Sequence, residues 1–263
     1  MKKTEKIIYY TDELKDEFAG DSLRPKKIDE NYSYDGNPFW RAIARFFWYW
    51  IIFHPIAFIY LKLFYAHKIV NKKVIKSEKK NAVFLFGNHT HAMADPYIPT
   101  FVAHPKSNYV IVHANNVSIP VLGKINPALG AIPLPDNIAA TRNFMKCIEN
   151  KIQKKASVTI YPEAHIWPYY TKIRPFVDSS FRYPVQFNTP VYCFTNTYQK
   201  KLFSKKPRIV TYVDGPFYPD TNLSAKEQRA KLRDQVYNAM VERSKLNTVE
   251  LIKYIKKEKT QND

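Results

Sequence analysis

The stretch AVFLFGNHTHAMADP, residues 82–96, joins a short apolar run to a cluster of polar side chains directly after it. The apolar run is brief and rich in residues that favour strands. Four later runs have the same character: NYVIV (108–112), SVTIY (157–161), PVYCF (190–194) and RIVTYV (208–213). Asn, Pro or Lys residues bound these runs. The sequence therefore predicts at least five short strands.

Helical patterns lie between and after these strands. Residues 138–155 repeat apolar side chains at helical spacing. Ser224 and Glu227 have the spacing of a capping box, which predicts a helix that runs to about Ser244. Strands that alternate with helices indicate an α/β fold, with a mixed sheet flanked by helices.

A segment of different character precedes the strands: FWRAIARFFWYWIIFHPIAFIYLKLFY, residues 39–65. Only His54 interrupts its apolar and aromatic run at 46–61, which is shorter than the roughly 20 residues of a membrane span. Pro55 is expected to kink or break it. Nine Lys or Arg residues fall within 39–80, against one acidic residue. The pattern predicts a membrane-associated helical pair lying in one leaflet; a buried helix and a single span stay open.

These changes along the chain divide it into four parts. Residues 1–38 are a polar arm of irregular structure, and 39–80 form the membrane-associated helical segment. Residues 81–223 carry the α/β domain, and 224–263 a C-terminal helical segment.

Composition limits the environment and the partners. The formal net charge of +18 comes from 41 Lys and Arg against 23 Asp and Glu, so the surface attracts anionic molecules. Hydrophobic residues make up 45% of the 263 residues, enough for a sizeable core. The two cysteines, Cys147 and Cys193, have no metal-type spacing and are predicted to be buried free thiols. No apolar core follows the N-terminal lysines, so a cytoplasmic location is expected.

Chemistry-bearing residues follow two of the strands. His89 and Asp95 come directly after the first strand, at the sheet edge where sites in α/β folds gather. A histidine held by a carboxylate keeps one ring nitrogen free to accept a proton, as a general base requires. Glu163 follows the strand at 157–161, where it can meet a polar substrate. Lys172 and Arg174 lie beyond it and are candidates to clamp a phosphate.

These blocks together resemble the glycerophospholipid acyltransferase family, which includes the lysophosphatidic acid acyltransferases. The resemblance covers roughly residues 80–215 and rests on the order of four features. Asn-His and then Asp follow a strand; Gly-Ala-Ile at 130–132 precedes a helix; a strand ends in aromatic-Pro-Glu at 161–163; and Pro190 opens a strand. The resemblance also implies a membrane-binding element in the N-terminal part of the chain.

The resemblance implies roles for individual residues. His89 is the general base, Asp95 is its orienting partner, and Asn88 shapes the same turn. Glu163 helps to hold the acceptor, and Gly130 belongs to the block that normally ends in a phosphate-binding arginine.

The chain departs from the family pattern at several positions. Five residues separate His89 from Asp95, where four are usual. Ala164 replaces the Gly of the Pro-Glu-Gly block, and His165-Ile166 replaces the Thr-Arg that follows it. The block at 130–132 continues without an arginine. Both usual phosphate-binding arginines are therefore absent from their positions, which affects the acceptor more than the reaction type.

The resemblance implies an O-acyltransferase. It moves a fatty acyl group from acyl-CoA or acyl-carrier protein to a lysophospholipid hydroxyl, by default that of 1-acylglycerol-3-phosphate, and so gives phosphatidic acid. We expect direct transfer with no metal and no cofactor. The expected location is the cytoplasmic face of the cell membrane, with peripheral or monotopic attachment, and no nucleic-acid partner is expected.

Two other interpretations stay open on the sequence. His89, His91 and Asp95 form a His-x-His-x-x-x-Asp run, which a metal-dependent hydrolase could use. The basic run KKLFSKKPR at 200–208 could instead belong to a non-enzymatic protein that binds membranes or nucleic acid.

Overall fold

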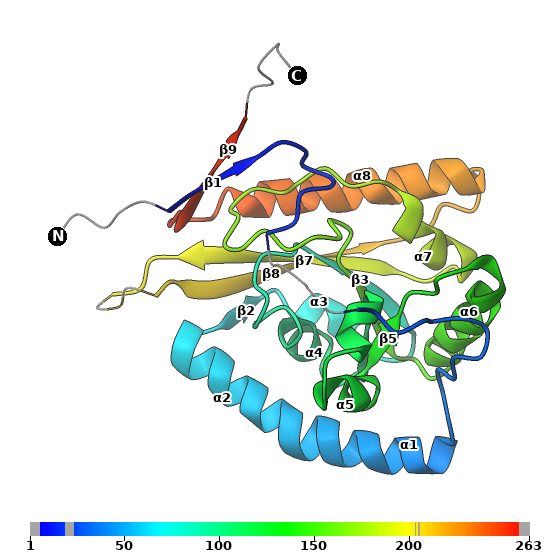
Figure 1. The fold of residues 1–263 in the computed structure, drawn as a ribbon. Helices are drawn as coiled ribbons and strands as arrows, with labels where there is room; N and C mark the ends of the chain where they lie inside the picture. Colours follow the sequence, from blue (N-terminus) through cyan, green and yellow to red (C-terminus); the bar gives the residue numbers. More distant parts are fainter. Residues whose placement is uncertain (1–5, 19–23, 203, 205, 258–263) are drawn as a thin grey trace, which may run out of the picture.

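The main body of the protein is one seven-stranded sheet. A computed structural model describes residues 6–18, 24–202, 204 and 206–257 of the chain. The strand order is β2-β8-β7-β3-β6-β4-β5, and all neighbours are parallel except β7 and β8 (Figure 1). The strands are β2 (Lys68–Val70), β3 (Val83–Gly87), β4 (Asn108–Val112), β5 (Ala131–Pro133), β6 (Ser157–Ile160), β7 (Val191–Gln199) and β8 (Arg208–Phe217). This mixed sheet, covered by helices, confirms the predicted α/β fold class.

Helices cover both faces of the sheet. They are α1 (Pro38–Arg45), α2 (His54–Tyr65), α3 (Lys73–Lys76), α4 (Ile98–Ala103), α5 (Leu122–Leu129), α6 (Ile138–Gln153), α7 (Arg182–Gln186) and α8 (Ala225–Ser244). Figure 1 shows α8 on one side of the sheet, with α1 and α2 on the other. The capping box predicted at the start of α8 is present, since Ser224 and Glu227 bond each other's backbone.

The central strand β3 is buried on both faces because its alternate side chains fill two cores. Phe84 and Phe86 pack on one face in a cluster with side chains of α6 and α8. Val83 and Leu85 pack on the other face with side chains of α2, α3 and α4. The residues that follow β3 therefore leave a strand that is fixed from both sides.

Residues 38–65 form one continuous helix of 28 residues, here called the long helix, and not the predicted pair broken at Pro55. The reason lies in the turn before the proline. Residues 46–53 are π-helical, and the His54 N–H donates to the carbonyl of Tyr49, five residues back. Pro55 directly follows this wider turn, which accommodates the proline ring without a break in the helix.

The two ends of the described chain pair with each other. β1 (Lys6–Tyr10) runs parallel to β9 (Ile252–Lys256), so the arm predicted to be irregular and the segment predicted to be helical each contribute a strand. The pairing joins residues far apart in sequence, and neither segment shows strand patterning strong enough to reveal it alone. The two strands project beside the main body in Figure 1.

The sheet also extends beyond the predicted domain limits. The five predicted strands overlap β3, β4, β6, β7 and β8, although β7 and β8 run further than predicted. The three-residue strands β2 and β5 were missed. β2 lies within residues 39–80 but pairs with β8, so this part of the predicted membrane segment belongs to the sheet.

Candidate active site

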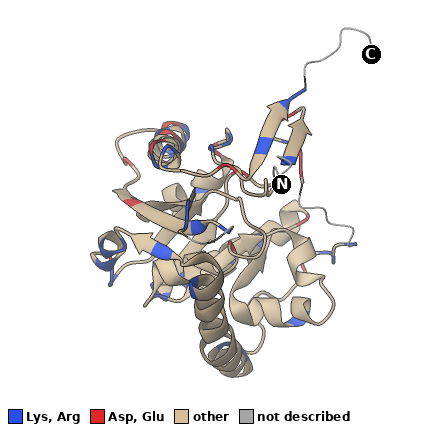
Figure 2. Cartoon of the chain, turned by 90° about the vertical axis from the view of Figure 1, so that its left-hand side faces the viewer, with Lys and Arg blue, Asp and Glu red and all other residues tan. Residues whose placement is uncertain are grey.

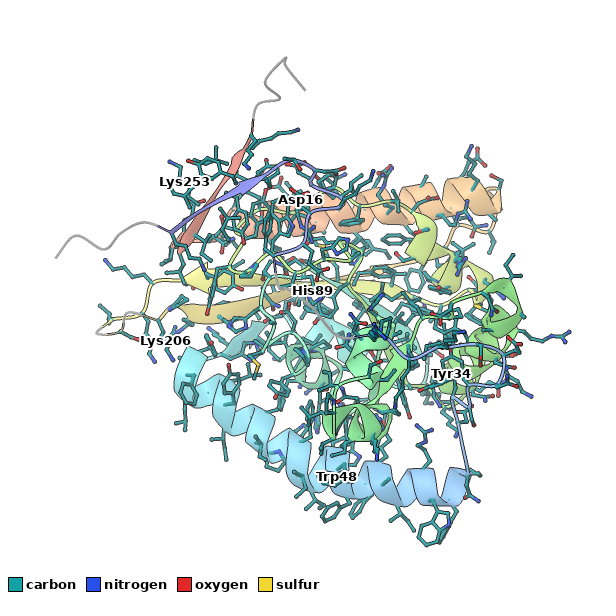
Figure 3. All side chains as sticks on the ribbon, in the orientation of Figure 1. Asp16, Tyr34, Trp48, His89, Lys206 and Lys253 are labelled. Carbon is teal, nitrogen blue, oxygen red and sulfur yellow. The ribbon has the colours of Figure 1, made fainter. Side chains whose placement is uncertain are left out.

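The turn after β3 carries the candidate catalytic residues. Gly87 ends the strand, and a Cβ there would clash with the Phe194 ring of β7, so glycine allows this close approach. Asn88 and His89 follow at the carboxyl edge of the sheet. In Figure 3 His89 lies in the middle of the molecule, whereas Trp48 marks the long helix at its lower edge.

His89 and Asp95 meet in the structure. The distance from His89 Nδ1 to Asp95 Oδ2 is 2.8 Å. Asp95 is fully buried, and the same oxygen accepts hydrogen bonds from the backbone N–H groups of Thr90 and His91, both at 2.9 Å. A carboxylate that accepts at Oδ2 fixes the proton of His89 on Nδ1 and leaves Nε2 free to accept another.

Tyr161 holds the other side of the His89 ring. The two rings stack with their centroids 4.3 Å apart, and the Tyr161 hydroxyl donates to the Asp95 carbonyl at 2.6 Å. The His89 side chain is 18% exposed, and its Nε2 has no hydrogen-bond partner within the described part of the chain. One nitrogen is therefore held and the other is open to a substrate, the arrangement of a general base.

Glu163 and Arg174 form a buried ion pair behind this turn. Arg174 Nη2 lies 3.5 Å from Glu163 Oε2, and neither side chain is exposed. The Glu163 carboxylate also accepts from the backbone N–H groups of His89 and Arg174, each at 3.1 Å. Burial raises the pKa of Glu163, and Arg174 opposes that rise. Glu163 thus fixes the backbone of His89.

The paired chain ends brace the segment that carries Glu163. Trp167 stacks on Tyr254 of β9 with centroids 5.0 Å apart and meets Tyr10 of β1 at 4.8 Å. Its backbone N–H donates to the His89 carbonyl. The Arg174 guanidinium lies over its ring at 4.8 Å. The terminal strands therefore hold the loop after β6 against the His89 turn.

Comparison with known proteins decides what kind of domain carries this site. Residues 67–196 match the protein family described as Acyltransferase. The chain belongs to the glycerophospholipid acyltransferase family. Its fold is also similar to the crystal structure of the 1-acyl-sn-glycerophosphate (LPA) acyltransferase PlsC from Thermotoga maritima, with a TM-score of 0.55. That similarity covers 81% of this chain and 82% of the other at 17% identity. No curated protein matches the chain.

Two other residues predicted for the acyltransferase site have structural positions. One bonds a neighbouring backbone, and the other lies away from His89. Asn88 is buried and exchanges two hydrogen bonds with the backbone of Asn196 on β7, at 3.0 and 2.7 Å. Gly130 precedes β5 at the amino edge of the sheet and has a φ of +107°. A Cβ there would lie 2.6 Å from the Asn108 carbonyl oxygen, so its role is conformational.

The two cations predicted to clamp a phosphate differ in position. Lys172 is exposed. Arg174 is not: besides Glu163, its guanidinium donates to the carbonyls of Glu13 and His165. Because the guanidinium of Arg174 is bonded to groups inside this acyltransferase, only Lys172 of the two is accessible to an anionic substrate.

His91 is placed unlike a metal ligand. Its Nδ1 accepts from the backbone N–H groups of Met93 and Ala94, and the Tyr169 hydroxyl lies 3.4 Å from its Nε2. Burial lowers its pKa. Both ring nitrogens are thus engaged inside the acyltransferase. Within residues 6–18, 24–202, 204 and 206–257, no three His, Cys, Asp or Glu side chains converge as a metal site would require.

Tyr161 and Asn196 were missed from the sequence. Tyr161 is the aromatic residue of the aromatic-Pro-Glu block at 161–163, but no role at the site was predicted for it. Asn196 lies at the middle of β7, and its Nδ2 is 3.4 Å from Asp95 Oδ1. Asn196 lies beyond the predicted strand at 190–194, in the polar Thr-Asn-Thr run through which β7 continues, and nothing in that run distinguishes it.

Replacing Arg174 by Ala tests the buried pair. The change leaves the Glu163 carboxylate without its counter-ion, and breaking such a pair costs about 3–5 kcal/mol. We expect the free energy of unfolding to fall by that amount in urea denaturation. Lys172→Ala is the control, and its exposed site predicts a change within about 0.5 kcal/mol. Normal stability of Arg174→Ala with a raised KM for the acceptor would instead identify Arg174 as a free phosphate ligand.

Proposed function

We propose that this protein transfers a fatty acyl group from a thioester donor to the hydroxyl of a lysophospholipid. The default acceptor is 1-acylglycerol-3-phosphate, whose acylation gives phosphatidic acid. The observation that carries the proposal is the 2.8 Å contact between His89 and the buried Asp95, at the strand end of an acyltransferase-family domain.

The reaction proceeds in two steps at His89. Its Nε2 accepts the proton of the acceptor hydroxyl while the oxygen attacks the thioester carbonyl carbon. Asp95 holds Nδ1–H and stabilises the imidazolium that forms. The tetrahedral intermediate then collapses, the carbon–sulfur bond breaks, and the leaving thiolate takes the proton from Nε2. General-base catalysis of this kind contributes about 10²–10⁴ to the rate.

Direct transfer is favoured over an acyl-enzyme. Cys147 and Cys193 are both buried, and burial raises the pKa of the Cys147 thiol to about 11. Burial also raises the pKa of Cys193. Neither forms a thiolate readily at neutral pH. We therefore propose direct transfer from acyl-CoA or acyl-carrier protein, in which no cofactor and no metal takes part.

The acceptor of the proposed reaction carries an anionic head group. The net charge of +18 favours such a ligand, and so does the exposed ammonium of Lys172. In this proposal Lys172 contacts the head group. The other predicted substrate-binding residues do not touch the substrate in this proposal. They fix the backbone around them: Asn88, Glu163, Arg174 and Gly130.

The long helix supports attachment to a membrane surface. It is long and apolar enough to cross a bilayer. Its buried residues Tyr49, Ala57, Leu61 and Tyr65 face the domain. Arg45 donates to the Asn108 carbonyl at 3.0 Å near one end, and Tyr65 meets His91 at 4.9 Å at the other. Its outer side exposes Phe39, Trp40, Ile43, Phe46, Phe47, Ile51, Ile56, Phe58, Ile59, Leu63 and Phe64.

To cross a bilayer, the helix would have to leave the domain that contacts it along its length. Figure 2 shows this helix almost free of charged residues at the bottom of the molecule. We therefore propose monotopic attachment, with the exposed side in one leaflet, and place it at the cytoplasmic face.

Acyl transfer from palmitoyl-CoA to a panel of lysophospholipids tests the reaction directly. We expect product on at least one acceptor with detergent-solubilised protein, and loss of nearly all product in His89→Ala. Lys172→Ala should raise the KM for that acceptor and leave kcat unchanged. Wild-type protein that acylates no acceptor, with acyl-carrier protein donors also tried, would refute the proposed function.

Flotation with vesicles that contain anionic lipid tests the attachment. Ile59→Lys and Leu63→Lys each place a charge on the exposed side of the long helix. Burial of such an apolar side chain contributes about 1.5–3 kcal/mol, so each change should weaken binding about tenfold or more. Ile138→Lys is the control, because Ile138 lies on α6, away from the long helix, and is 93% exposed. This variant should bind the vesicles as the wild type does. Equal flotation of all variants would exclude the long helix as the membrane contact.

A further inference from the structure

A chain of buried polar side chains extends from Asp95 away from His89. Asn196 Nδ2 donates to Asp95 Oδ1, the oxygen that His89 does not use, at 3.4 Å. Thr211 Oγ1 donates to Asn196 Oδ1 at 2.7 Å. His67 Nε2 lies 2.8 Å from Thr211 Oγ1. Three side chains thus connect Asp95 to the segment that follows the long helix.

The direction of these hydrogen bonds is fixed by their chemistry. The Thr211 hydroxyl has one proton, and it is given to Asn196. His67 Nε2 must therefore be the donor to Thr211, which sets the tautomer of His67. Burial lowers the pKa of His67 to about 4, so its ring is neutral at pH 7. Each donor in the chain points toward Asp95.

The chain of side chains crosses two paired strands of the sheet. Asn196 and Thr211 stand opposite each other in the antiparallel pair of β7 and β8. Both are at most 1% exposed, and His67 is 4% exposed. The backbone of Asn196 is also fixed by its two bonds with Asn88. Buried hydrogen bonds of this kind strengthen one another and resist rotation of the groups that they join.

We propose that Asn196, Thr211 and His67 are positioning residues for the His89–Asp95 pair. They hold Asp95 Oδ1, so that Oδ2 keeps facing His89 Nδ1 through the reaction cycle. The inference rests on the proposed function, because it assigns residues to the base of that reaction. None of the three touches the substrate.

Thr211→Val tests the inference with little change in shape. Valine keeps the volume of threonine but removes the hydroxyl that joins His67 to Asn196. We expect kcat for transfer from palmitoyl-CoA to 1-acylglycerol-3-phosphate to fall about tenfold, within the roughly 10²-fold that a small misplacement can cost. The KM of both substrates should stay at the wild-type value.

The pH–rate profile separates positioning from a loss of folded protein. A less firmly held Asp95 stabilises the imidazolium less, so the acidic limb of the kcat profile moves to lower pH. The other titratable residues at this turn are Tyr161, whose ring stacks on that of His89, Glu163, which accepts from the His89 N–H, and His91, whose backbone N–H donates to Asp95. Thr211→Val changes none of them. A smaller folded fraction would scale the whole profile without moving its limb.

Two further variants control the experiment. Thr211→Ser retains the hydroxyl and should restore both kcat and the limb. Thr195→Val removes a fully buried hydroxyl of the same strand pair that has no partner within the described residues. It should leave kcat and the profile unchanged.

The outcomes separate this inference from the proposed function. Wild-type transfer that is lost in His89→Ala, together with a Thr211→Val enzyme of normal kcat and unmoved limb, would overturn the positioning chain alone. A wild-type protein that transfers no acyl group would overturn the proposed function and the positioning chain with it.

Discussion

The buried carboxylate of Asp95 is the constraint on which the site depends. A carboxylate removed from water costs several kcal/mol unless donors surround it, and here four donors converge on it. They are the Thr90 and His91 N–H groups, His89 Nδ1 and Asn196 Nδ2. The two backbone N–H groups donate to Asp95 Oδ2 and so fix the path of the turn, and His89 Nδ1 donates to the same Oδ2 atom. The requirement to satisfy Asp95 thus shapes the turn and aims the His89 ring.

The fold supplies what this arrangement needs from each direction. β3 is fixed by cores on both faces and delivers His89 at a defined edge. β7 and β8 bring Asn196 and Thr211 to the far side of Asp95, and the loop after β6 brings Tyr161 and Glu163 to the near side. The long helix packs beneath the same turn through Tyr65. Membrane attachment, as proposed, therefore holds the His89 turn in a fixed position relative to the lipid surface without a mobile linker.

Local features of the sequence predicted much of this structure. The central strands, the capping box of α8 and the pairing of His89 with Asp95 all depend on residues within a few positions of each other. The pairing of β1 with β9 does not, and it was missed. The burial of Arg174 in an ion pair could not be predicted either, because its partners Glu163 and Glu13 come from separate segments of the chain. The contact of Asn196 with Asp95 could not be predicted, because it depends on how β7 is placed between its neighbouring strands. The continuous long helix was missed because the π-helical turn that accommodates Pro55 has no simple sequence signature.

The most direct test of the account is the turnover rate of Asp95→Asn. The amide has the size of the carboxylate but lacks the charge that stabilises the imidazolium. With its oxygen held by the Thr90 and His91 N–H groups, its Nδ2 faces the Nδ2 donor of Asn196. Retained circular dichroism with kcat lowered about 10³–10⁴-fold at saturating palmitoyl-CoA and acceptor is the predicted result. A folded Asp95→Asn enzyme with kcat near that of the wild type would contradict the account, because His89 would then act without the carboxylate that organises its turn.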